Sequence, residues 1–158
     1  QTTALAVWSE HGPVIIRSVR PYRPITVNVV TGTALHLLTS ASGRVFAAHL
    51  PRAMTQARIR QEQALQQLPA ELQTQAGVEA LLAQVRHEGI STVADYHLVP
   101  GVAAAAAPVF NFKHEITLSL LVIGVKGMID LEPGGPVVGA LKRTAHVLSV
   151  RLGHAAGS

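Results

Sequence analysis

The stretch GVAAAAAPVF, residues 101–110, decides the fold of this chain. Its five consecutive alanines are strong helix formers, but a run of five is too short to hold a helix in water. Pro108 cannot donate a backbone hydrogen bond and disfavours the helical conformation at Ala107. The flanking Val102 and Phe110 favour a strand. We therefore expect a strand whose two faces carry very little side-chain volume.

Alternate residues of a strand face opposite sides of the sheet. Val102, Ala104 and Ala106 would thus share one face, and a neighbouring strand over 116–124 would add Ser119, Leu121 and Ile123 to one face. Small side chains let helices approach a sheet closely, or leave volume that a ligand can fill. The residues alone leave both interpretations open.

The N-terminal third predicts strands. Two apolar runs at 4–8 and 13–19 flank a short turn with the sequence SEHG, which is typical of a β-hairpin. Residues 25–30 alternate and predict a third strand. The segment ISTVADYHLVPG, residues 90–101, predicts a strand followed by a loop ahead of the alanine stretch.

Helices are predicted between and after these strands. Ser40 or Ser42 can cap a short helix that Pro51 interrupts, and residues 52–68 predict an exposed helix. Apolar residues at helical spacing within 78–85 predict another, ended by Gly89. A last helix follows the loop at 132–136. Roughly six strands joined by tight turns, with about four helices, indicate an α+β fold with an antiparallel sheet.

Length and composition set the class of protein. A chain of 158 residues fits one domain, and its 48% hydrophobic content is that of an ordinary globular protein. It has no apolar run long enough to span a membrane, no signal peptide at its start and no cysteine. We expect a cytoplasmic protein. Gly157 and Ser158 are typical of a cloning remnant.

The net charge of +4 does not predict a nucleic-acid surface. The 13 Lys and Arg residues are scattered along the chain, and aromatic residues make up only 4% of it. Proteins that bind nucleic acid gather basic side chains and use aromatic rings for stacking. The charge is therefore interpreted as solvated surface, and we expect no DNA binding by this chain itself.

Motifs for catalysis or metal binding are missing from the sequence. It has no G-x-S-x-G, P-loop or H-E-x-x-H pattern, and its eight histidines do not pair at ligand spacings. Asp95 and His97 would share one strand face, but two ligands do not make a zinc site. We therefore expect the protein to bind neither a metal ion nor a cofactor. Of the possible classes of protein, an enzyme is a weaker hypothesis than a binding domain.

Several segments resemble one known family. TSASGRVFAAHLP (39–51), VRHEGI (85–90), ADYHLVPGVAAAAAPVF (94–110), LSLLVIG (118–124) and HVLSVRLG (146–153) occur in that order. Together they are similar to the C-terminal effector-binding domain of the IclR family of bacterial transcriptional regulators. The similarity covers nearly the whole chain, which we take as one domain over residues 1–156. Its most specific parts are the PG-x6-PV segment and the ASGR helix start.

The resemblance implies a GAF-like domain with a cupped antiparallel sheet. Members carry a winged helix-turn-helix ahead of this domain, and that portion is absent here. The implied function is to sense a small molecule and control DNA binding by the missing domain, without catalysis. The implied partners are the effector and further copies of the chain, as a homodimer or homotetramer.

The resemblance also implies a set of ligand-binding residues. The effector would lie between the sheet and the start of the first helix, at Ala41 and Ser42. The family's acidic residue falls on Asp95, His97 stands where a second acid is common, and the stretch between Gly89 and Gly101 is one residue longer than usual. The expected set is completed by residues of the two strands that follow, namely Val102, Ala104, Ser119, Leu121 and Ile123.

Three of these residues depart from relatives that bind small polar acids. Ala104 replaces a cysteine, and Leu121 and Ile123 replace two serines. The effector is therefore expected to be a hydrophobic or aromatic carboxylic acid. Two alternatives stay open, namely an enzyme on a GAF-like fold that acts on a small acid, and an oligomerisation module without a ligand.

Overall fold

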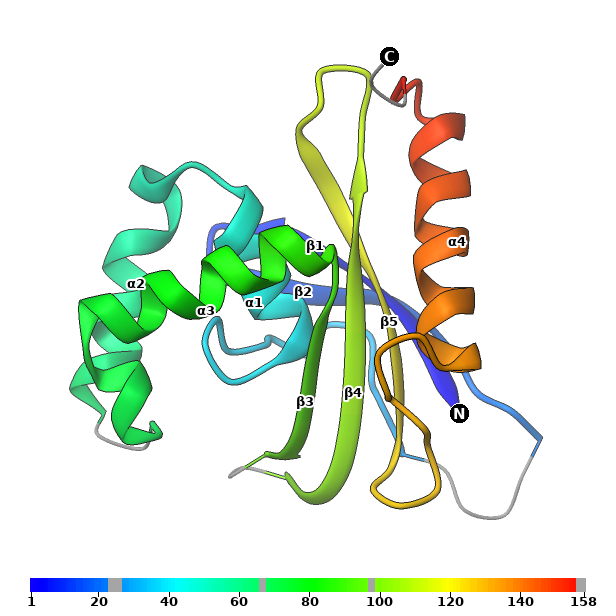
Figure 1. The fold of residues 1–158 in the computed structure, drawn as a ribbon, viewed down its shortest axis with the longest axis horizontal. Helices are drawn as coiled ribbons and strands as arrows, with labels where there is room; N and C mark the ends of the chain where they lie inside the picture. Colours follow the sequence, from blue (N-terminus) through cyan, green and yellow to red (C-terminus); the bar gives the residue numbers. More distant parts are fainter. Residues whose placement is uncertain (23–26, 66–67, 97–98, 156–158) are drawn as a thin grey trace.

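A five-stranded antiparallel sheet organises the molecule, and its strands run in the order β2-β1-β5-β4-β3 (Figure 1). The computed structural model describes residues 1–22, 27–65, 68–96 and 99–155. The fold is α+β, as the sequence predicts. The strands are β1 (Thr2–Ser9), β2 (Gly12–Val19), β3 (Ser91–Tyr96), β4 (Val99–Phe110) and β5 (Ile116–Val125).

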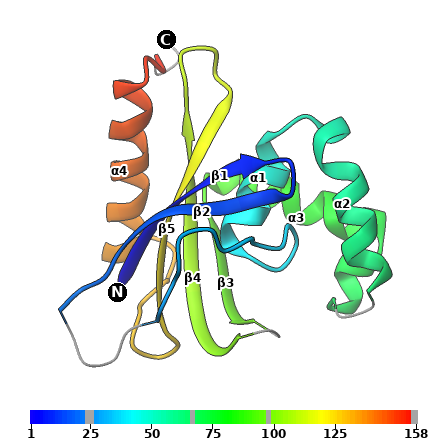
Figure 2. The ribbon, with the colours of Figure 1, turned by 180° about the vertical axis from the view of Figure 1, so that it is seen from behind.

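Helices cover both faces of this sheet. The helices are α1 (Ala41–His49), α2 (Arg52–Ala64), α3 (Gln75–Glu88) and α4 (Pro136–Arg151), with a short 3-10 helix, η1 (Ala70–Gln73). One face is packed by α1, which α3 backs, and the opposite face of β4 and β5 is packed by α4 (Figures 1 and 2). Among the described residues, no helix is long and apolar enough to cross a membrane.

The alanine stretch is the strand β4, second from one edge of the sheet. Its alanines pair with β3 on one side and β5 on the other, for example Ala104 with Val93 and with Ile123. Ala103, Ala105 and Ala107 are buried on the α4 side, in one apolar cluster with Leu141 and Ala145. The close-packing interpretation of the small side chains is therefore correct for this face.

The helix boundaries follow their local signals. The Ser40 side chain caps the start of α1, and Leu50 is the C-cap residue at its end, just before Pro51. The Thr74 side chain accepts a hydrogen bond from the Gly77 N–H at the start of α3. Gly89 ends α3 in the left-handed conformation, with φ of 66°, where a glycine carries no steric cost.

One expected strand does not form in the described residues. Residues 27–30 of the predicted strand 25–30 are irregular, and the remainder lies outside the described residues. Val27 and Val29 still pack against the core. Their carbonyl oxygens accept hydrogen bonds from the Thr2 and Ser18 hydroxyls, at 3.0 and 2.9 Å. Alternating apolar residues therefore indicate contact with the core here, without a strand ladder.

The helix predicted over 52–68 is also shorter than expected. It ends at Ala64, and Leu65 is exposed. Leu68 and Leu72 are buried, and the chain turns through η1 between α2 and α3. Pro69 precedes η1, and a proline disfavours helical conformation in the residue before it.

The burial of Ala105 against α4 generates a stability prediction. Ala105→Leu adds three carbon atoms to a fully buried site, so we expect the free energy of unfolding to fall by about 1–3 kcal/mol. Ala94→Leu is the matched control, because Ala94 is exposed on the neighbouring strand. Urea denaturation measures both variants, and equal effects would contradict the packing described for β4.

Candidate functional site

The start of α1 is fixed by a tight turn whose parts come from the sequence SASGR. The Ser40 hydroxyl donates to the His36 carbonyl (2.6 Å) and accepts from the Gly43 N–H (2.9 Å). A Cβ at Gly43 would overlap the His36 carbonyl oxygen, so this position needs glycine. The Arg44 side chain donates to the Leu38 carbonyl (2.7 Å) and so joins the helix to the preceding segment.

A buried carboxylate holds the segment that leads into α1. Glu62 of α2 is only 6% exposed, and its two oxygens accept the backbone N–H groups of Leu37 and Leu38, at 2.6 and 2.9 Å. Hydrogen bonds to a charged acceptor are stronger than neutral ones. The His36 Nδ1 lies 3.8 Å from the same carboxylate. Through Glu62, α2 positions the entry to α1 although it does not lie on the sheet.

Ser42 connects the start of α1 to the sheet. Its hydroxyl lies 3.0 Å from the Ser119 hydroxyl on β5, and both residues are almost completely buried. Ala41 is buried beside it. Among the described residues, the backbone N–H groups of Ala41 and Ser42 have no recorded hydrogen-bond partner. Such N–H groups, with the positive end of the helix dipole, attract anions.

Beyond this helix start, the same face of the sheet is less covered. Ala106 and Leu121 form one cross-strand pair and are buried, at 0% and 3% exposure. In the next such pair, Ala104 with Ile123, Ala104 is half-buried. Val93 and Val102 are half-buried too. The uncovered part of this face is therefore apolar and lies next to the start of α1.

Asp95 lies in a β-bulge. It adopts a left-handed φ of 54°, between Ala94 and Tyr96, where the β3–β4 register shifts. The bulge falls within the stretch between Gly89 and Gly101, which the resemblance predicts to be one residue longer than usual. The Asp95 carboxylate is exposed and forms an ion pair with Lys126 at the end of β5. His97, expected to share a strand face with Asp95, lies outside the described residues.

The expected residues thus fall into three groups. Ala41, Ser42, Ser119 and Leu121 are buried together around the start of α1, whereas Asp95 is exposed at the end of the sheet. Val102 and Ala104 are half-buried on the less covered part of the apolar face, and Ile123, which pairs with Ala104, is buried at 7% exposure. Sequence reasoning missed the supporting roles of Glu62 and Gly43. The glycine of the SGR pattern could have been noticed, but Glu62 acts on residues 24 and 25 positions away.

Two cavities lined by described residues lie on the α4 side of the sheet. One of about 350 Å³ lies between α4, β1 and β5, and one of about 570 Å³ lies between α4 and the end of α3. Among the described residues, no three His, Asp or Glu side chains are grouped to hold a metal ion.

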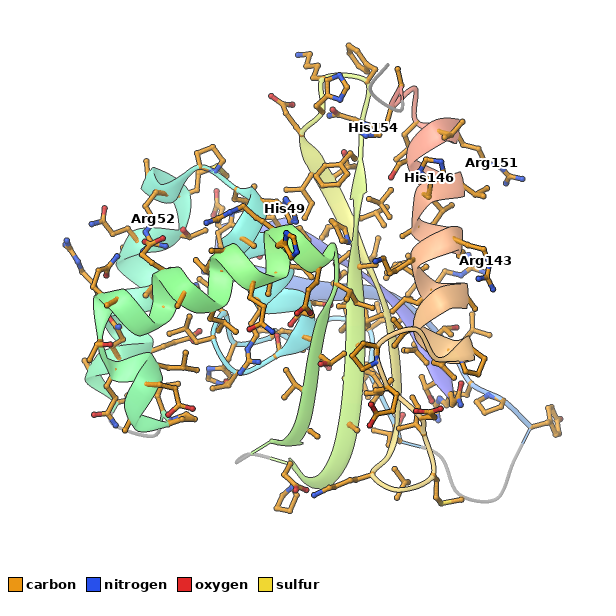
Figure 3. The ribbon with its side chains drawn as sticks, in the orientation of Figure 1. His49, Arg52, Arg143, His146, Arg151 and His154 are labelled. Atoms are coloured by element: carbon orange, nitrogen blue, oxygen red, sulfur yellow. The ribbon has the colours of Figure 1, made fainter. Side chains whose placement is uncertain are left out.

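His49 is the last residue of α1 (Figure 3). Its ring packs edge-on against Phe110, with centroids 5.1 Å apart, and its Nε2 is buried without a recorded partner among the described residues. Burial, with a smaller contribution from the nearby Arg86 guanidinium, lowers the pKa of His49 to about 4. The ring therefore acts as an apolar packing group at neutral pH.

Comparison with known proteins decides the family. Residues 1–150 match the family model described as the bacterial transcriptional regulator IclR C-terminal domain. The chain belongs to the IclR family. The most specific segments identified in the sequence lie within the matched residues. No curated protein matches the chain.

Solved structures of IclR-type regulators share the fold. HmgR of Pseudomonas aeruginosa is 31% identical, with a TM-score of 0.88 over 99% of this chain and 61% of that chain. IclR of Thermotoga maritima is 19% identical, with a TM-score of 0.82 over 98% of this chain and 62% of that chain. The repressor BlcR of Agobacterium tumefaciens is 19% identical, with a TM-score of 0.73 over 98% of this chain and 61% of that chain.

This IclR-family chain spans about three-fifths of the length of those structures. The family and these structural neighbours are transcriptional regulators and not enzymes. The match therefore supports the regulatory interpretation of the sequence over the catalytic one.

The packing of Gly43 generates a second prediction. Gly43→Ala would force a methyl group into the His36 carbonyl, so we expect a loss of about 3 kcal/mol or more in unfolding free energy. Gly139→Ala is the control, because Gly139 lies in α4 beside the flexible Arg143 side chain. Helix propensity should make that variant more stable by about 0.5–1 kcal/mol. Similar losses in both variants would argue against the tight turn.

The buried His49 generates a third prediction, on pH. The lowered pKa means that the unfolded chain binds a proton on this ring before the folded chain does, so stability falls as pH drops from about 6.5 to about 4. Allowing for partial exposure, this contribution should be about 2 kcal/mol. His49→Phe should flatten the pH dependence of the free energy of unfolding in that range. The exposed His146→Phe should leave it as in the wild type.

Proposed function

We propose that this chain is the effector-sensing domain of a bacterial transcriptional regulator. Binding of a small molecule would change how a linked N-terminal winged helix-turn-helix is presented to DNA. Membership of the IclR family supports the regulatory role. The observation that carries the sensing role is the uncovered apolar face next to the unsatisfied N–H groups of Ala41 and Ser42.

The chemistry of this region suits a carboxylate with an apolar body. The free amides at the start of α1 and the helix dipole would hold the carboxylate. The apolar body would contact Val102, Ala104 and Ile123 on the sheet. With a strand rise of about 3.4 Å per residue, Ile123 lies roughly 14 Å along β5 from Ser119, a span longer than an aromatic ring.

The polar groups of the site have distinct proposed roles. The Ser42 and Ser119 hydroxyls hydrogen-bond to each other and would orient the start of α1, and the hydroxyl that accepts in this pair keeps its own O–H to donate to the effector. Asp95 or His97 would contact a hydroxyl or second polar group of the effector. Since Asp95 pairs with Lys126, that contact would have to share the carboxylate with a cation.

Leu121 contributes to the site from beneath the helix. It is buried beneath α1 and packs in the same core cluster as the helix, so the proposed effector would contact it next to the helix. Because Leu121, Ile123 and Ala104 carry no polar side-chain atoms, this region offers water few hydrogen-bond partners. A hydrophobic or aromatic carboxylic acid is therefore the proposed effector, in preference to glyoxylate or pyruvate.

The proposed assembly is a homodimer or homotetramer in the bacterial cytoplasm, with DNA contacted through the N-terminal domain. The scattered basic residues of this chain offer no cluster for DNA. An enzyme acting on a small acid would instead show turnover of the bound compound, and a pure oligomerisation module would bind none.

Calorimetry with benzoate and glyoxylate tests the proposal. Burying the area of a ring is worth roughly 2–3 kcal/mol, so benzoate should bind about 10- to 100-fold more tightly than glyoxylate. Ala104→Phe fills the uncovered face and should weaken benzoate binding at least about tenfold. Ala57→Phe, on the exposed side of α2, is the matched control and should bind as the wild type does. Tighter binding of glyoxylate than of benzoate to the wild type would contradict the assignment.

A further inference from the structure

Two histidines from distant parts of the sequence meet at one end of the molecule. His114 lies in the turn between β4 and β5, and His154 follows the end of α4, beside that turn (Figures 1 and 3). Their Nδ1 atoms are 3.1 Å apart, although the residues are 40 positions apart in the chain. The spacing of histidines along the sequence therefore does not predict this pair, because only the folded chain brings the turn and α4 together.

A third electron-donating atom lies beside the two rings. The backbone carbonyl oxygen of Asn111 is 3.3 Å from the His154 Nδ1. The same oxygen accepts the His114 backbone N–H at 3.0 Å, which leaves it one further lone pair. Two ring N–H groups facing each other at 3.1 Å would repel, so at most one proton fits between the rings. Three atoms with lone pairs thus share one proton, an arrangement that suits a cation.

The distance between the two ring nitrogens fits a single transition-metal ion. Such ions bind histidine nitrogens at about 2.0–2.1 Å. Two nitrogens on one ion therefore lie roughly 2.9 Å apart at a right angle and roughly 3.4 Å apart at the tetrahedral angle. The observed 3.1 Å falls between these values, so an ion could enter with little movement of either ring. Imidazole nitrogens suit Zn²⁺, Cu²⁺ and Ni²⁺, whereas Mg²⁺ and Ca²⁺ prefer oxygen.

Packing and hydrogen bonds hold both rings in place. The His154 ring stacks on Phe110 with centroids 5.3 Å apart, and it meets the His114 ring edge-on at 4.7 Å. The Asn111 side-chain oxygen accepts the backbone N–H groups of Lys113 and Glu115, at 2.9 and 3.1 Å, and so fixes the turn. His114 has a left-handed φ of 59°, a conformation that is uncommon outside glycine. The two ligands are therefore positioned before any ion binds.

The pair is accessible to ions from solvent. His114 and Glu115 are exposed, and His154 is half-buried. A Glu115 carboxylate oxygen lies 3.5 Å from the Asn111 side-chain amide, which places a negative charge near the rings. Two histidines and one carbonyl leave coordination positions for water, unlike a structural zinc site with four protein ligands. Such a site exchanges its ion readily.

We propose that the Nδ1 atoms of His114 and His154, with the Asn111 carbonyl, bind a divalent ion of the Zn²⁺, Cu²⁺ and Ni²⁺ class. The ion links the β4–β5 turn to the end of α4. Because the protein supplies fewer ligands than a structural zinc site has, the Kd is roughly 1–100 µM. This metal site shares no residue with the proposed effector site, so it is an additional function of the domain.

Calorimetric titration of the untagged chain with ZnCl₂ and with NiCl₂ tests the site. The wild type should bind a single ion per chain. His154→Gln removes one ligand, and His114→Asn removes the other with a residue that tolerates a left-handed φ. Each should raise the Kd for the metal at least about tenfold. The matched control is His146→Gln, at an exposed histidine of α4, which should leave the Kd unchanged (Figure 3).

Two further measurements report on the bound ion directly. An ion that binds only the folded chain raises its stability, so a hundredfold excess of Zn²⁺ over the Kd should raise Tm by roughly 5–10 °C in the wild type. The rise should be absent in His154→Gln and present in His146→Gln. Electron paramagnetic resonance of bound Cu²⁺ should show coupling to two imidazole nitrogens in the wild type and to one in His154→Gln.

Three results would overturn the proposal. They are no saturable binding of Zn²⁺ or Ni²⁺ up to about 1 mM, an unchanged metal Kd in both His154→Gln and His114→Asn, and an equal loss of affinity in His146→Gln. The first would leave the two rings as a hydrogen-bonded pair only. Failure here is separable from failure of the sensing role, because both variants should bind benzoate as the wild type does. That binding also shows that the variants are folded.

Discussion

The structure depends on one strand that can be packed from both sides at once. Ala103, Ala105 and Ala107 of β4 are buried in the apolar cluster under α4, while Ala106 is buried under α1 on the other face. Larger side chains at these positions would push one or both helices outward, because protein interiors are already close-packed. The alanines therefore set how near each helix lies to the sheet. The position of α1 in turn decides how much of the sheet face next to it stays only half-buried.

Polar anchors then decide where α1 begins on that sheet. Glu62 holds the backbone ahead of the helix, Ser40 caps it, and Ser42 bonds to Ser119 on β5. The hydrogen bonds of Glu62 and Ser42 are buried, where an unpaired partner would be costly, and that of Ser40 is partly buried. Because a bound anion would contact the same helix start, effector binding would act directly on an element that α2 and β5 also hold. The site and the scaffold thus share their residues.

The candidate site was predictable in part. The resemblance located the start of α1 and the strands that face it, and Ala41, Ser42 and Ser119 do come together. The surroundings of Asp95 were not predictable, since a bulge with a left-handed residue breaks the alternation used to assign its face. The Ser42–Ser119 hydrogen bond was not predictable for a different reason, because it joins residues 77 positions apart that no local pattern relates.

The sequence by itself determined the elements and their order. Caps at Ser40 and Thr74, the stop at Gly89 and the alternation in β1 and β5 are local signals, since they act within one turn of helix or between neighbours in a strand. Only the tertiary structure decided that residues 27–30 join the core without forming a strand, and that Glu62 serves a distant backbone. Those outcomes follow from how layers dock, and docking depends on contacts between residues that no local pattern relates.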